Sequence, residues 1–173
     1  MPIKVKYVVL TEDHANWIID NTRAQYKRLF KDHGKYKDIQ KYLDETYALE
    51  PLVKSHNDFS KQMLMAFEES VPVASAELLA SLPEEERPEN SDKPLLTRKM
   101  LHNTEGKGLA ELLQRSEEIA RQKKHDTLLI RTFGANDTAQ KIIRNAGFEP
   151  HKTEHARMGN ASVEQLLFIK NMV

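Results

Sequence analysis

The longest regular spacing of apolar residues in the chain begins at Leu109. From there, small or apolar residues recur at i, i+3, i+4 and i+7, the spacing of one face of an α-helix. Basic residues at positions 121, 123 and 124 suit the negative, C-terminal end of the helix dipole. The apolar face consists of Leu109, Leu112, Leu113, Ser116, Ile119 and Ala120. The pattern predicts an amphipathic helix from about Leu109.

Extended apolar runs at residues 95–101 and 127–133 flank this helix. The second run, TLLIRTF, is short and partly β-branched, which is typical of a buried strand. Two strands joined by a helix pair in parallel, through a right-handed crossover. We therefore expect one parallel pair inside an otherwise antiparallel sheet.

The first half of the chain predicts two further helices. Thr11 suits the N-cap of a helix that ends near Gly34. A second helix is expected from about Ile39 until Pro51 interrupts it, since proline disfavours helical geometry in the residue before it. A short helical piece around residues 52–53 is a further candidate.

Strands are predicted on either side of these helices and at the C-terminus. Residues 4–10 form the first strand, with Val5, Tyr7 and Val9 on one face, and residues 62–68 and 71–79 form a hairpin. Residues 81–94 hold three prolines and an acidic cluster, so we expect a solvated loop there. A last helix, capped near Asn136, ends at Gly147. An extended piece follows, and residues 166–169 form the last strand.

This order predicts an α/β (α+β) fold with a single domain over residues 1–173. The sheet is expected to be mixed and twisted, with about six to seven strands and helices on both faces. A chain of 173 residues with 39% hydrophobic residues is long enough for one real core.

Composition excludes several classes of protein. Lys plus Arg and Asp plus Glu balance at 26 each, which argues against a large nucleic-acid footprint. No apolar run approaches the ~20 residues that a membrane span needs, and the N-terminus has no signal-peptide core. The chain has no cysteine, which rules out disulfides, thiolate zinc sites and a cysteine nucleophile. We expect a cytoplasmic protein with no metal.

The candidate chemistry lies in the glycine turn before the main helix, residues 105–110. Two glycines in three residues let the backbone turn with its N–H groups unshielded, and the positive end of a helix follows. Such a turn can hold a phosphate group. It is neither a Walker-type loop nor a dinucleotide fingerprint, because Gly108 and Glu111 stand where those motifs need other residues. A plain glycine turn remains the alternative.

Residues 105–150 resemble the acetyl-CoA-binding half of the GCN5-related N-acetyltransferase (GNAT) family. The family turn reads Gln/Arg-x-x-Gly-x-Gly/Ala, and its second signature is Asn, Ala three residues on, Tyr, then Gly-Phe. Here the turn reads EGKGLA, and the second signature is held by Asn136, Ala139, Ile143 and the pair Gly147 and Phe148. Residues 42–45 and 155–160 are also similar to bacterial polyamine acetyltransferases of the PaiA kind.

The resemblance implies a single GNAT-like domain, with a substrate-side part at about 1–80 and an acetyl-CoA-binding part at about 95–150. Backbone donors of residues 106–110 would hold the pyrophosphate, and the pantetheine arm would lie along Met100 and Leu101. The reaction would be direct transfer of an acetyl group to a primary amine. The residues implied for the acetyl-CoA site are Met100, Leu101, His102, Glu105, Gly106, Lys107, Gly108, Leu109, Ala110, Asn136, Ala139 and Ile143.

The sequence departs from the family pattern at two positions. Glu105 replaces the residue that opens the turn, and either Lys107 compensates its charge or the side chain points away. Ile143 stands where the family has the tyrosine that protonates the leaving thiolate, and isoleucine donates no proton. For the general base, Glu77 and His102 are candidates, and an ordinary strand or loop role is the alternative for each.

Three functions therefore stay open. The first is acetylation of a small amine, with polyamines as the leading class. The second is a non-catalytic acyl-CoA-binding module, and the third is acetylation of a peptide N-terminus. No nucleic acid or membrane partner is expected, and the sequence does not decide whether the protein is a homodimer.

Overall fold

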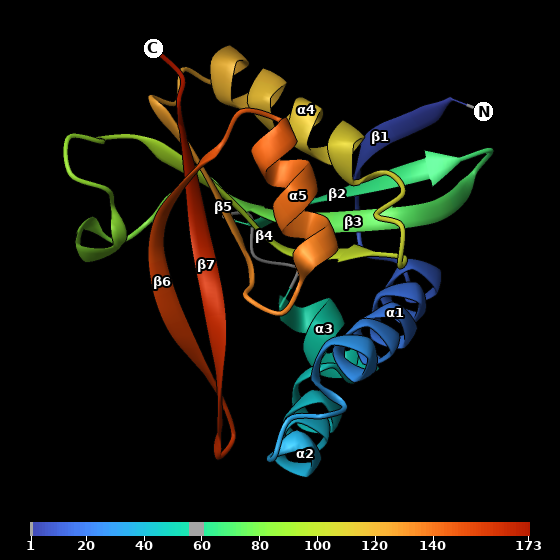
Figure 1. The fold of residues 1–173 in the computed structure, drawn as a ribbon. Helices are drawn as coiled ribbons and strands as arrows, with labels where there is room; N and C mark the ends of the chain where they lie inside the picture. The colour runs from blue at the N-terminus through green and yellow to red at the C-terminus, as the bar shows by residue number, and fades with distance from the viewer. Residues whose placement is uncertain (1, 56–60) are drawn as a thin grey trace.

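The computed structural model describes residues 2–55 and 61–173, which form a seven-stranded sheet with helices on both faces (Figure 1). The strand order is β1-β2-β3-β4-β5-β7-β6. The helices are α1 (Glu12–Phe30), α2 (Tyr36–Thr46), α3 (Leu49–Ser55), α4 (Leu109–Gln122) and α5 (Asp137–Asn145). The strands are β1 (Ile3–Val8), β2 (Lys61–Glu68), β3 (Val71–Leu79), β4 (Pro94–His102), β5 (Thr127–Phe133), β6 (Glu149–Met158) and β7 (Ala161–Asn171). The predicted mixed sheet is confirmed.

The parallel pair of the sheet is β4 with β5, and α4 makes the crossover between them, as predicted. Every other pairing in the described sheet is antiparallel. The parallel pairing is short: it begins at Pro94 with Thr127 and ends at Thr97 with Ile130. Beyond these residues the two strands separate, and the functional site is built around this separation.

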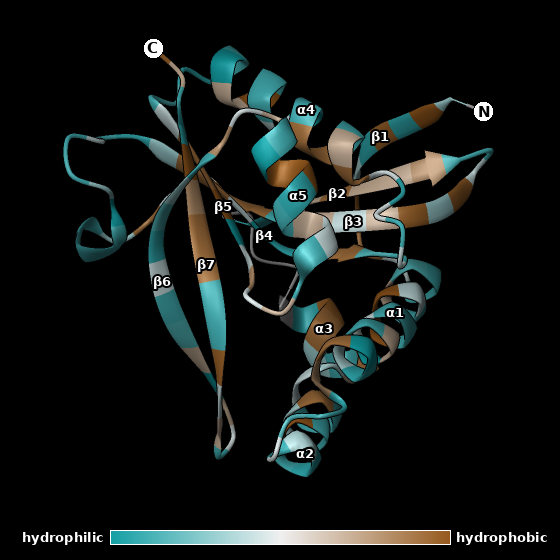
Figure 2. Ribbon diagram, in the orientation of Figure 1, coloured by the Kyte–Doolittle hydropathy of each residue, from teal (hydrophilic) through white to brown (hydrophobic). Residues whose placement is uncertain are grey.

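Two layers of helices cover the sheet. Helices α4 and α5 pack on one face, where Leu112, Leu113 and Ile143 join the core, and α1, α2 and α3 pack on the other around Ile18 and Ile39. Figure 2 shows the matching pattern, with hydrophobic residues along the central strands and hydrophilic residues on the outer sides of the helices. The predicted apolar face of α4 is confirmed residue by residue, since all six members are buried. None of the described helices is long and apolar enough to cross a membrane.

The C-terminal hairpin is longer than predicted. Strands β6 and β7 pair from Glu149 with Ile169 to Met158 with Ala161, whereas only residues 166–169 were expected to form the last strand. The prediction was short because β6 is largely exposed and rich in charged residues, so it lacks the apolar alternation that marks a half-buried strand. Charged side chains suit β6, because it is an edge strand that must not pair with other chains.

The N-terminal elements differ from the prediction at their ends. Thr11 caps α1 as predicted, its hydroxyl accepting a hydrogen bond from the backbone N–H of His14. Val9 lies outside β1 and is 86% exposed, so its assignment to the first strand was wrong. Pro51 does not interrupt a helix, contrary to the prediction. It lies in the first turn of α3, where the missing N–H costs no helical hydrogen bond.

The proline-rich segment before β4 is anchored at its end. The carboxylate of Asp126 accepts hydrogen bonds from the Ser91 hydroxyl and from the backbone N–H groups of Asp92 and Lys93. Leu82, earlier in the segment, is buried against the sheet. The predicted loop is therefore packed at two points.

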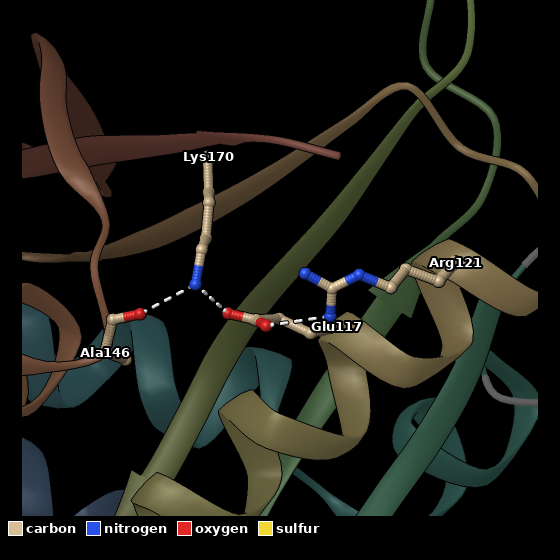
Figure 3. A network of polar contacts seen from close by, with 4 residues as sticks. All are labelled: Glu117, Arg121, Ala146 and Lys170. Atoms are coloured by element: carbon tan, nitrogen blue, oxygen red, sulfur yellow. Dashed lines mark hydrogen bonds and ion pairs between the residues drawn. The ribbon is translucent and has the colours of Figure 1, made fainter. Parts of the chain in front are cut away.

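A polar network fastens α4 and α5 to β7 (Figure 3). The Lys170 ammonium donates to the backbone oxygen of Ala146 at 2.8 Å, at the C-terminal end of α5, and also to the Glu117 carboxylate on α4. The other Glu117 oxygen pairs with Arg121 at 3.1 Å. Because a cation at a helix C-terminus also interacts favourably with the helix dipole, Lys170 stabilises the layer formed by α4 and α5.

Candidate active site

The glycine turn packs tightly between α5 and the sheet. Gly106 and Gly108 have φ angles of 75° and 85°, in the left-handed region that favours glycine. A Cβ at Gly106 would lie 2.5 Å from the terminal methyl of Ile142, and one at Gly108 would lie 3.0 Å from the Ala66 Cβ and a Val73 methyl. Backbone conformation therefore requires both glycines, and packing against the sheet also requires Gly108.

The turn uses some of its own N–H groups. The side-chain oxygen of Asn103 accepts from the backbone N–H groups of Glu105 and Lys107, at 3.1 and 3.0 Å. The N–H of Gly106 donates to the Asn103 backbone oxygen, and that of Leu109 donates to Gly106. These bonds fix the shape of the turn. They also use several of its N–H groups, so not every residue of 106–110 can donate to a phosphate group.

Three donors remain at the start of α4. The backbone N–H groups of Gly108, Ala110 and Glu111 have no acceptor within residues 2–55 and 61–173. Gly108 is the N-cap and provides no capping side chain, so the positive end of the helix dipole is uncovered. This arrangement suits an anion such as a phosphate group.

The two charged side chains of the turn lie apart from these donors. The Lys107 ammonium pairs with the Glu68 carboxylate at 2.6 Å, at the end of β2. Glu105 is exposed, and its side chain makes no ion pair with the described residues. An anion at the helix start would therefore be held mainly by backbone donors.

A bulge in β4 accompanies the separation of β4 from β5. On β3, Ser75 and Glu77 are two residues apart, yet their partners on β4, Leu101 and Arg98, are three apart. The extra residue is accommodated at Lys99, whose φ of 52° is unusual for a residue with a side chain. The bulge lies directly after Thr97, where the pairing of β4 with β5 ends.

Helix α1 covers the β4 edge that this separation uncovers. The Gln25 side chain is buried, donates to the Met100 backbone oxygen at 3.0 Å and accepts from the His102 N–H at 3.1 Å. Arg28 donates to the His102 backbone oxygen at 3.3 Å. Gln25 thus makes the two hydrogen bonds that a neighbouring strand would make, along the segment implied for the pantetheine arm.

His102 joins the two signature motifs. Asn136, the N-cap of α5, accepts from the Ala139 N–H and therefore presents its amide N–H to the His102 Nε2, at 2.9 Å. The other ring nitrogen, Nδ1, then carries the proton and donates to the Asn103 backbone oxygen at 2.6 Å. Burial lowers the pKa of His102, and the nearby Arg28 lowers it further. With both nitrogens occupied, the neutral ring is poorly placed to act as the predicted general base.

We expect acid to destabilise the fold through His102. In the unfolded chain the pKa is about 6.5, above the folded value, so the unfolded state takes up the proton first as pH falls. The free energy of unfolding should be unaffected above about pH 6.5 and should fall below it by at most about 1.4 kcal/mol per pH unit. Urea unfolding between about pH 7.5 and about pH 5 measures this slope. His102→Gln should be less stable throughout but should show a shallower slope.

His125 provides the remaining slope, since burial lowers its pKa as well. Equal slopes for the unmodified protein and His102→Gln would contradict this account.

A cavity of about 460 Å³ lies on the α1–α3 side of the separated strands. Glu77 lines it from β3, and Arg98 and Lys99 line it from β4. The Glu77 side chain is 2% exposed; one of its oxygens pairs with Arg98 at 2.9 Å and the other with Lys99 at 3.7 Å. Desolvation lowers the pKa of Lys99.

Hydroxyl groups from the helical layer also line the cavity. Tyr26 comes from α1, Tyr42 from α2, and Tyr47 immediately follows α2. Burial is the main cause that raises the pKa of Tyr47 to about 12, and it raises that of Tyr26 as well. The Tyr26 and Tyr47 phenols therefore stay protonated at neutral pH and can donate hydrogen bonds. The described residues contain no cluster of His, Asp and Glu that could hold a metal ion.

The structure brings only some of the predicted site residues to the cavity. Met100, Leu101 and Glu77 line it, whereas His102 and Asn136 lie behind it. Ala139 and Ile143 are fully buried in the core beneath α5.

Three residues at the site were not predicted from the sequence. Gln25, Arg98 and Arg131 resemble ordinary surface residues of a helix or strand, and their partners are 21 to 77 positions away in the chain. An unusually buried polar residue on an amphipathic helix, such as Gln25, is the signal that could have been followed.

Known structures share this fold over nearly the whole chain. The PaiA N-acetyltransferase of Thermoplasma acidophilum, in complex with coenzyme A, is 17% identical, with a TM-score of 0.69 and 99% of each chain covered. An N-acetyltransferase of Staphylococcus aureus is 16% identical with a TM-score of 0.62, again with 99% of each chain covered. A GNAT-family acetyltransferase of the same species is 14% identical with a TM-score of 0.62, covering 98% of this chain and 100% of the other.

By sequence, no protein-family model and no curated protein matches the chain. The likeness in structure confirms the GNAT fold that the two motifs predicted.

Proposed function

We propose that this protein transfers an acetyl group from acetyl-CoA to the primary amine of a small molecule. The observation that carries the proposal is the separation of β4 and β5 at the Lys99 bulge. It lies between a helix start with unpaired N–H donors and a cavity with polar walls. A two-part substrate with a phosphate end and a reactive end needs both features on one strand pair. The fold is also that of N-acetyltransferases, one of which was solved with coenzyme A.

The residues present fit coenzyme A at its phosphate end. The uncovered N–H groups of Gly108, Ala110 and Glu111 would hold the pyrophosphate. The two glycines allow the tight turn that presents these donors, because both have φ angles in the left-handed region. When bound, acetyl-CoA supplies a thioester, whose carbonyl carbon accepts the amine and whose thiolate leaves.

The cavity residues would prepare the amine. The nitrogen attacks only as the free base, so a proton must leave the ammonium form. Of the two candidate bases, Glu77 lines the cavity, and we assign it to take this proton directly or through water. The new C–N bond forms as the C–S bond breaks, and the nitrogen then loses its second proton, which reaches the leaving thiolate through water.

Two measurements test the proposal. Calorimetry should detect binding of acetyl-CoA and of free coenzyme A, and a thiol assay should detect coenzyme A release when small primary amines are added. Release that depends on both acetyl-CoA and an amine supports transfer. A folded protein that neither binds acetyl-CoA nor releases thiol with any amine would sink the proposal.

A second candidate function is a non-catalytic acyl-CoA-binding module. Ile143 favours it, because this fully buried residue stands at the position of the family's proton donor. Binding of coenzyme A without thiol release from any amine would support the module. Acetylation of a peptide N-terminus fits less well, since a cavity bounded by α1, α2 and α3 suits a compact acceptor.

Restoring the family tyrosine at this position is not expected to raise turnover. Ile143 is 0% exposed in the core beneath α5, so Ile143→Tyr must find room for a larger ring and a hydroxyl. Overpacking of this kind costs about 1–3 kcal/mol. We expect a lower midpoint in urea and unchanged thiol release per folded molecule, with Ile143→Leu as the volume-matched control. Faster release by a stable Ile143→Tyr protein would show instead that the site lacked only an acid.

A further inference from the structure

We infer that the acceptor is a compact amine that also carries a carboxylate, and not a polyamine. The inference rests on the proposed function and concerns which amine the cavity takes. It is drawn from the charges on the cavity wall and from one buried hydroxyl that has no partner.

The wall carries more positive than negative charge where β3 meets β4. Glu77 is the acidic residue that lines the cavity among the described residues, and it lies between two cations, Arg98 and Lys99. The guanidinium of Arg98 holds one carboxylate oxygen through both Nε and Nη2, at 3.2 and 2.9 Å. Lys99 is more loosely held, at 3.7 Å, and its side chain is 46% exposed. One cation therefore remains in excess, on the side chain that is freer to move.

Arg131 adds a second cationic group from β5. Its Nε lies 3.3 Å from a Glu154 oxygen, and the other Glu154 oxygen is shared with Lys152 at 3.8 Å. Two cations thus share this carboxylate as well. The described charged residues that line the cavity are therefore four cations and one carboxylate, namely Arg98, Lys99, Arg131, Arg157 and Glu77, which leaves the wall positive on both sides of the separated strands.

Thr22 marks a place for a further polar group. Its hydroxyl is the one buried side-chain oxygen or nitrogen in the described residues that has no hydrogen-bond partner. Thr22 is 1% exposed and lines the cavity from α1. A buried polar atom without a hydrogen-bond partner costs free energy of folding. Because Thr22 lines the cavity, we assign its missing partner to a polar group of the ligand. A hydroxyl can donate to a carboxylate, which accepts hydrogen bonds only.

These features suit a molecule with one positive and one negative end. The ammonium to be acetylated needs a nearby acceptor for its proton, which Glu77 provides, and a carboxylate on the same molecule finds Lys99, Arg131 and the Thr22 hydroxyl. A diamine of the same size would place its second ammonium among cations. Like charges in a partly desolvated cavity repel more strongly than in water.

The experiment compares amines that differ in one charged group. Norleucine is paired with its amide, and δ-aminovalerate with cadaverine, so that each pair keeps its length and changes only the end group. Binding of each compound is measured by calorimetry in the presence of free coenzyme A, without turnover, and thiol release from acetyl-CoA is measured separately. We expect the carboxylate member of at least one pair to bind about tenfold more tightly, as one added charged hydrogen bond implies.

A charge reversal at Lys99 provides the second test. Lys99→Glu should reverse the preference within the δ-aminovalerate and cadaverine pair, since the wall then carries an excess of negative charge. Lys124→Glu is the matched control, because Lys124 is also exposed and also has a positive φ, of 61°, but lies beyond the C-terminal end of α4. The control should keep the preference of the unmodified protein.

The binding and turnover readouts separate the two proposals. Tighter binding of the carboxylate amines without any thiol release would support the inference and overturn the proposed function. The inference would be overturned if the diamine and the amide each bind at least as tightly as the carboxylate member of their pair, if none of the four compounds binds, or if Lys99→Glu leaves the preference unchanged. In any of the cases that overturn the inference, thiol release from cadaverine would still support acetyl transfer.

Discussion

Gly108→Asp is expected to unfold most of the protein. At a φ of 85° any side chain is strained, and the new Cβ would lie 3.0 Å from Ala66 and Val73 atoms and 3.2 Å from the Ala74 Cβ, in the sheet. The left-handed backbone costs about 1–2 kcal/mol, overpacking about 1–3 kcal/mol, and the buried carboxylate adds a further penalty. The sum is comparable with the whole stability of an ordinary domain, about 5–15 kcal/mol. Circular dichroism and urea unfolding measure the loss.

Ala110 provides the test of phosphate binding that Gly108 cannot provide. It is exposed at the second position of α4, where an acidic residue favours the helix dipole and should leave the fold intact. Ala110→Asp should weaken coenzyme A binding by about tenfold or more, because it sets a carboxylate beside the bound phosphates. Ala110→Lys, the matched control, should bind at least as tightly as the unmodified protein. Unchanged affinity in folded Ala110→Asp would show that the start of α4 is not the phosphate site.

Glu77→Gln is expected to reduce turnover by about 10²–10⁴, the usual contribution of a positioned general base. The variant also removes the anion between Arg98 and Lys99, so stability should fall as well. The loss of stability should be below the about 3–5 kcal/mol found for broken buried pairs, because the Arg98 and Lys99 side chains are 23% and 46% exposed. Thiol release is therefore compared per folded molecule.

A pH profile separates the catalytic role of Glu77 from its structural one. If Glu77 takes the proton, kcat/KM of the unmodified protein should fall on the acid side, and Glu77→Gln should lack that limb. Glu77→Asp keeps the charge with a shorter side chain, and it should keep the limb with lower turnover. A Glu77→Gln protein with the same acid limb would assign the base elsewhere, for example to water.

The β4–α4–β5 unit was predictable because its determinants are local. The α4 face repeats within four residues, and the residues that begin α5 and end it, Asn136 and Gly147, are adjacent to the helix. The ends of β6 were not predictable in this way. That strand is stabilised by its pairing with β7, and its own exposed side chains carry little pattern.

The cavity was the least predictable part of the site. Its polar wall depends on contacts such as Gln25 with His102 and Arg98 with Glu77, which exist only once α1 and the sheet have packed. The sequence identified Glu77 and His102 as equal candidates for the base. We assign the base to Glu77 because it lines the cavity, whereas both nitrogens of the His102 ring are occupied by Asn103 and Asn136.

The hydrogen-bond chain through His102 explains why the spacing of the two signature motifs matters. Ala139, Asn136, His102 and Asn103 connect the first turn of α5 to the glycine turn before α4, so the two helix starts are held at one fixed separation. From the glycine turn, the polypeptide runs along α4 and then back along β5 to the start of α5. The lengths of α4 and β5 must therefore match for these hydrogen bonds to form. A residue inserted near the glycine turn would disrupt these hydrogen bonds. A residue inserted at residues 123–126 would only lengthen the bend that joins α4 to β5. Homologous chains should therefore vary in length at that bend and stay constant between the motifs and the cavity.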